Sequence, residues 1–76
     1  MISDVIRELL QEKDESRIYN YYNICFRWKN GKIVASARED LNYMVRTFHP
    51  SYYKTIDALS EAIESVYAIP LVYNFY

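Results

Sequence analysis

The dipeptide Asn30-Gly31 constrains the fold of this chain more than any other feature. Gly31 is the only glycine among the 76 residues. Asn-Gly is the strongest short-range signal for a two-residue hairpin loop, because both central residues of a type I′ turn need positive φ. Runs of alternating apolar and polar residues flank the dipeptide. The sequence therefore predicts an antiparallel β-hairpin that turns at Asn30-Gly31.

The length of the loop also predicts the register of the two strands. Its strands are expected at residues 18–28 and 32–37, and a two-residue loop sets Lys29 opposite Lys32. One face of the hairpin is then apolar throughout and is expected to be core, while the other face is partly solvated. The expected core face holds Tyr22, Ile24, Phe26 and Trp28, the last three facing Ala37, Ala35 and Ile33.

Three further segments have the apolar spacing of amphipathic helices. The first covers residues 2–13, with Ser3 as its candidate N-cap. The second covers residues 38–48, and the third covers residues 56–67 with Thr55 as its candidate cap. The order of elements predicts an α+β fold: a helix, a hairpin and then two helices.

The chain is long enough for one domain, residues 1–76, and not for two. Residues 71–76 are compatible with a third strand beside the hairpin. Such a strand would help, because a two-stranded sheet alone is marginally stable.

Composition narrows the function classes. The net charge is −1, from nine basic and ten acidic residues, which does not support sequence-independent nucleic-acid binding. Cys25 is the only cysteine, so no intrachain disulfide or Cys-based metal site can form, and it is expected in the core. No segment approaches the roughly 20 apolar residues of a membrane span. We expect a cytoplasmic protein that makes no membrane contact.

The residues do not predict an enzyme, a cofactor or a metal site. His49 is the only histidine. Ser51 lies two residues away, but the sequence supplies no group that would orient such a pair for catalysis. A single glycine excludes a Gly-rich phosphate loop.

Binding to another protein is the better-supported interpretation. The chain has nine tyrosines, a residue type favoured where a surface binds a protein, although a small core also uses Tyr. Carboxylates occur in groups that either cap helices and face solvent or form an acidic recognition patch. These groups are Asp14 with Glu15, Glu39 with Asp40, and Asp57 with Glu61 and Glu64.

The segment ISDVIREL at residues 2–9, with Lys13-Asp14 after it, resembles the first helix of a family of small phage-encoded anti-CRISPR proteins. The resemblance continues through ICFRWKNG at residues 24–31 and the order of the following elements. That family blocks the RNA-guided nuclease of type II CRISPR systems. The resemblance implies that Asp14, Asn30 and Gly31 contact the nuclease and that the last helix lies in the corresponding acidic region.

The sequence departs from this family at two places. Lys29 and Lys32 flank the hairpin tip, which carries no carboxylate, so the tip is a poor mimic of DNA. The family's first short strand has no counterpart in the predicted elements. The resemblance therefore implies inhibition of the nuclease, by occluding DNA binding or activation, while leaving the contacted surface open.

The leading hypothesis is a stoichiometric protein-binding inhibitor of phage or mobile-element origin, whose partner is an RNA-guided nuclease. Two alternatives stay open. One is a small nucleic-acid-binding regulator that uses the basic rim of the hairpin, although direct nucleic-acid binding is not favoured. The other is a structural or assembly protein that forms a homodimer through exposed tyrosines.

Overall fold

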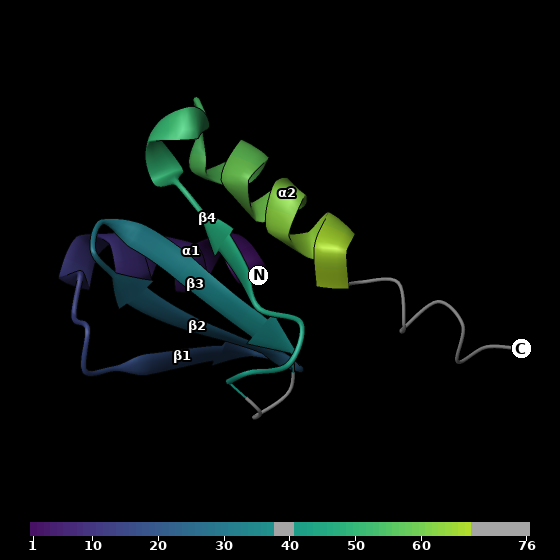
Figure 1. Ribbon diagram of the computed structural model, residues 1–76. Coiled ribbons are helices and arrows are strands. Elements are labelled where there is room, and N and C mark those ends of the chain that lie inside the picture. The colour runs from purple at the N-terminus through teal and green to yellow at the C-terminus, as the bar shows by residue number, and fades with distance from the viewer. Residues whose placement is uncertain (38–40, 68–76) are drawn as a thin grey trace, which may run out of the picture.

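The computed structural model describes residues 1–37 and 41–67. Within these ranges it has two α-helices and four strands, drawn in Figure 1. The strands form one antiparallel sheet in the order β1-β2-β3-β4, which is also their order along the chain. This is the α+β class that the sequence predicted. The elements are α1 (Ile2–Glu12), β1 (Ile18–Tyr21), β2 (Ile24–Lys29), β3 (Lys32–Ala37), β4 (Arg46–Phe48), the 3-10 turn η1 (Pro50–Tyr52) and α2 (Ile56–Tyr67).

Both helices contribute to the core on one face of the sheet. Ile24 and Phe26 of β2 are buried there, and alternation along the strand puts them on the same face. Ile6 of α1 and Ile63 of α2 are fully buried in the same cluster. The opposite face, which we call the open face, is covered by neither helix. On the open face Cys25 is buried, as expected, and its Sγ donates a hydrogen bond to Asn20 Oδ1 at 3.0 Å.

The central hairpin forms with the predicted turn and register. Asn30 and Gly31 have φ values of 51° and 76°, as a type I′ turn requires. Lys29 pairs with Lys32, and the apolar pairs follow in the predicted order along the ladder. Trp28, which was expected inside the core, is instead half-buried at the margin of the core.

The predicted long strand at residues 18–28 is wrong, because the chain reverses direction at Tyr22 and Asn23. Two strands result, and β1 pairs antiparallel with β2. Tyr22 therefore leaves the core face and is 84% exposed. It has a φ of 53°, a conformation that costs energy in a bulky residue. The turn lacks a glycine signal, and β1 supplies the short strand before the hairpin that the sequence interpretation omitted.

The predicted helix at residues 38–48 is also wrong over the residues that the structure describes. Residues 41–44 form turns and bends, and Arg46–Phe48 form the edge strand β4. Of the apolar residues at helical spacing, only Phe48 is buried, where it pairs with Ile33 of β3. Core contact of this one aromatic residue in a strand outweighs the helical spacing. Glu39 and Asp40 lie outside the described residues.

The other two helices are close to their predicted bounds. α1 begins after Met1 and ends before Lys13, which has a φ of 49°. Ser3 is therefore inside the helix and buried, and does not cap it. For α2, the predicted cap is confirmed: Thr55 Oγ1 accepts a hydrogen bond from the Ala58 backbone N–H at 3.0 Å. The possible strand at residues 71–76 lies outside the described residues.

The backbone conformation of Tyr22 gives a stability prediction. Replacing Tyr22 by Gly removes the clash of Cβ at positive φ and is expected to raise the free energy of unfolding by up to about 1 kcal/mol. Chemical denaturation followed by circular dichroism measures this change. Tyr22→Ala is the matched control, because it removes the same ring but keeps Cβ. Equal stabilities of the two variants would contradict the strained conformation.

Candidate partner-binding site

The loop between α1 and β1 lies against the tip of the central hairpin. Glu15 Oε2 accepts a hydrogen bond from the backbone N–H of Asn30 at 2.9 Å. Lys13 Nζ lies 5.9 Å from the ring centroid of Trp28, within range of a cation–π contact. We call residues 13–17 and 28–33 the tip assembly. It brings together four of the predicted site residues: Asp14, Glu15, Asn30 and Gly31.

The two carboxylates of this loop have structural partners. Asp14 Oδ1 accepts hydrogen bonds from the backbone N–H of Ser16 at 2.9 Å and from its hydroxyl at 2.7 Å. These bonds lower the pKa of Asp14 and close an Asx turn. Glu15 holds the hairpin tip. Both residues therefore shape the site from within, and neither carboxylate is left without a partner.

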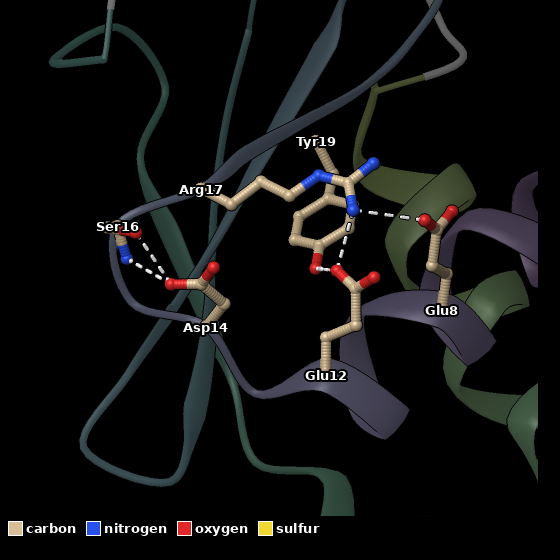
Figure 2. A network of polar contacts seen from close by, with 6 residues as sticks. All are labelled: Glu8, Glu12, Asp14, Ser16, Arg17 and Tyr19. Carbon is tan, nitrogen blue, oxygen red and sulfur yellow. Dashed lines mark hydrogen bonds and ion pairs between the residues drawn. The ribbon is translucent and has the colours of Figure 1, made fainter.

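A second network fixes the end of α1 to the start of β1 (Figure 2). Arg17 Nη1 lies 3.0 Å from a carboxylate oxygen of Glu8 and 2.6 Å from one of Glu12. The Arg17 guanidinium also lies over the ring of Tyr19, 4.3 Å from its centroid. The Tyr19 hydroxyl donates a hydrogen bond to Glu12. Burial and this hydrogen bond raise the pKa of Tyr19 to about 12.

The carboxylates of α2 differ from those of the loop. Asp57, Glu61 and Glu64 are exposed, and we call them the α2 acidic edge. Among the described residues, no ion pair or hydrogen bond engages these side chains or joins them to the tip assembly. The structure therefore divides the predicted site into two separate regions.

Among the described tyrosines, some are buried in the core and others are exposed. Tyr19 and Tyr67 belong to the core, and the Tyr67 hydroxyl donates a hydrogen bond to the carbonyl of Met44 at 2.7 Å. Tyr22 and Tyr52 are largely exposed. His49 stacks on Tyr52, with ring centroids 4.8 Å apart, which gives that histidine a structural contact.

The sequence interpretation missed a depression that is lined mostly by residues of the tip assembly. This depression has a volume of about 190 Å³ and is lined by Glu15, Arg27, Trp28 and Lys29. The alternation of Arg27 with Lys29 along the strand did indicate a basic rim. Nothing in the sequence indicated that Glu15 would lie beside it, because that proximity depends on the path of the loop.

The described residues contain no group of His, Cys, Asp or Glu that could hold a metal ion. No helix within them is both long and apolar enough to cross a membrane. No protein-family model, curated protein or solved structure matches this chain.

The raised pKa of Tyr19 predicts a loss of stability at alkaline pH. A tyrosine whose folded-state pKa exceeds its unfolded value stabilises the fold below the unfolded value and loses that contribution as pH rises through the folded value. Stability should therefore fall between pH 10.0 and about 12. Tyr19→Phe should reduce this fall without abolishing it, because burial also raises the pKa of Tyr67.

Urea denaturation at a series of alkaline pH values measures this effect. Tyr52→Phe is the control, because the Tyr52 ring is exposed. An alkaline profile of Tyr19→Phe identical to that of the control would show that the Tyr19 hydroxyl does not contribute.

The contact between Glu15 and Asn30 gives a local prediction. Glu15→Ala removes the acceptor of the Asn30 amide, so that amide should exchange with solvent faster in an NMR hydrogen-exchange measurement. Global stability should change by less than about 1 kcal/mol, because the contact is exposed. Glu61→Ala removes a carboxylate elsewhere and should leave the exchange at Asn30 unchanged. Unchanged exchange of the Asn30 amide in Glu15→Ala would show that Glu15 does not hold the hairpin tip.

Proposed function

We propose that the protein is a stoichiometric inhibitor that binds another protein and blocks it by occlusion, without a cofactor. The observation that carries this proposal is the tip assembly. Its turn is held by Glu15 at the backbone of Asn30, and Lys13 lies over Trp28. A surface held in one conformation before binding loses less entropy on binding, so that more of its contact energy becomes affinity.

The α2 acidic edge supplies a second contact region. Its three carboxylates are exposed, and they lie at helical spacings of four and three residues on one side of α2. Unpaired charges of one sign steer association toward a partner surface of the opposite sign. The edge therefore suits a basic surface on the partner protein.

The resemblance of residues 2–9 and 24–31 to an anti-CRISPR family points to the RNA-guided nuclease of a type II system as the partner. Such nucleases hold nucleic acid in a positively charged channel. In this proposal the α2 acidic edge faces that channel and excludes DNA, while the tip assembly contacts a different surface of the nuclease. The protein would then act in the cytoplasm of a host cell, as the product of a phage or mobile element.

A cleavage assay tests this proposal. Purified protein is added to a type II nuclease loaded with guide RNA, before target DNA, and the fraction of DNA cleaved is measured. We expect inhibition that is complete near one protein per nuclease. Full cleavage at a large excess of the protein, together with no co-elution of the two proteins in gel filtration, would overturn the proposal for the nuclease tested.

Variants of α2 test the assigned surface. Glu61→Gln with Glu64→Gln removes two charges from the α2 acidic edge and should weaken inhibition by about tenfold. Gln11→Lys with Ser51→Lys is the matched control, because it changes the net charge by the same two units at exposed positions elsewhere. An equal loss of inhibition in both variants would show that net charge, and not the α2 acidic edge, causes the loss.

A further inference from the structure

A row of four paired residues crosses the open face of the sheet. Ile18 of β1 pairs with Arg27 of β2, Arg27 with Val34 of β3, and Val34 with Thr47 of β4. Arg27 therefore lies between two aliphatic side chains, of which Ile18 is 46% exposed. By alternation along β2, Lys29 points to the same face as Arg27.

Three positive charges gather at the tip end of this face without a negative partner. Lys29 lies directly opposite Lys32 in the ladder, an arrangement of like charges that destabilises a sheet. Among the described residues, Arg27, Lys29 and Lys32 make no ion pair. Folding alone does not account for this cluster, which we call the open-face cations.

The carboxylates of α1 and of the loop that follows it have other partners. Glu8 and Glu12 bind Arg17, and Asp14 accepts two hydrogen bonds from Ser16. Glu15 lines the depression beside Arg27, but its Oε2 accepts the backbone N–H of Asn30. Among the described residues, none of these carboxylates forms an ion pair with the open-face cations, which are therefore available to an external partner.

The side chain of Arg27 gives the clearest indication that a ligand binds here. Its Nε is shielded from solvent and has no hydrogen-bond partner among the described residues. A charged donor buried without an acceptor is costly. Arg27 and Lys29 also line the depression of about 190 Å³, and its lining is completed by Glu15 and by Trp28, which belongs to the core side of β2. A carboxylate placed there can accept from the planar guanidinium fork and also meet the ammonium of Lys29.

We propose that the open-face cations bind an acidic segment of a partner protein, with one carboxylate on Arg27 and neighbouring apolar side chains on Ile18 and Val34. This inference rests on the protein-binding function proposed above and names the chemistry of one partner surface. The net charge of −1 favours a protein partner over nucleic acid, because sequence-independent binding of nucleic acid needs a net basic surface.

Trp28 provides a direct readout, because it is the only tryptophan and it lines the depression. A short peptide of alternating Glu and Val is titrated into the intact protein while Trp fluorescence is recorded. We expect a saturable change, absent with a peptide in which Gln replaces every Glu. Binding should weaken by about tenfold in Arg27→Gln and in Lys29→Gln, since each loses one charged contact.

Lys54→Gln is the matched control, because it removes one exposed positive charge outside the sheet. It should leave the peptide affinity nearly unchanged. Because Arg27 is partly buried, circular dichroism confirms that its variant folds, and the exposed Lys29 provides an independent variant. No saturable response to the Glu-Val peptide, or equal weakening in all three variants, would overturn the proposal.

A single-stranded DNA oligonucleotide is titrated in parallel. Tight, steeply salt-dependent binding of DNA that Arg27→Gln abolishes, without peptide binding, would assign the open-face cations to phosphates and overturn the proposal. This experiment is independent of the cleavage assay. Peptide binding without inhibition of a nuclease would overturn the proposed target but support the acidic-segment site. Inhibition without peptide binding would overturn the acidic-segment site alone.

Discussion

The turn at Asn30-Gly31 and the ladder that it starts determine where every other strand can lie. β1 adds to the outer edge of β2, and β4 adds to the outer edge of β3. A slip of one residue in the central ladder would move Phe26 to the open face and leave α1 and α2 without an apolar sheet to cover. The only glycine of the chain is at the position where this register is set.

Sequence patterns predicted the parts of the fold whose signals are local and physically specific. Asn30-Gly31 meets the backbone requirement of a type I′ turn, which few other dipeptides do. The Thr55 cap likewise marks the start of α2. The turn at Tyr22 could not be predicted, because a tyrosine at positive φ is disfavoured locally and is retained only because β1 gains a partner strand. β4 was missed for a similar reason, since the burial of Phe48 against Ile33 is a tertiary contact.

The sequence predicted which residues come together at the hairpin tip better than it predicted the partners of their side chains. Residues 14, 15, 30 and 31 do come together, but the carboxylates of Asp14 and Glu15 accept hydrogen bonds from Ser16 and from the Asn30 backbone. Charge that is free for a partner is instead segregated: negative on α2 and positive on the open face near the tip. A near-zero net charge conceals this separation, because composition counts charges without reporting which of them neutralise one another.

The agreement between strand order and chain order has a consequence for folding. Each strand pairs with the strand just before it, so the sheet needs no crossover between distant segments. Contacts between residues close in sequence form with a small loss of chain entropy, and proteins rich in them fold quickly. The sheet can therefore grow strand by strand in the order of synthesis. α2 comes last among the described elements, and its packing on α1 closes the core around a sheet that can already be formed.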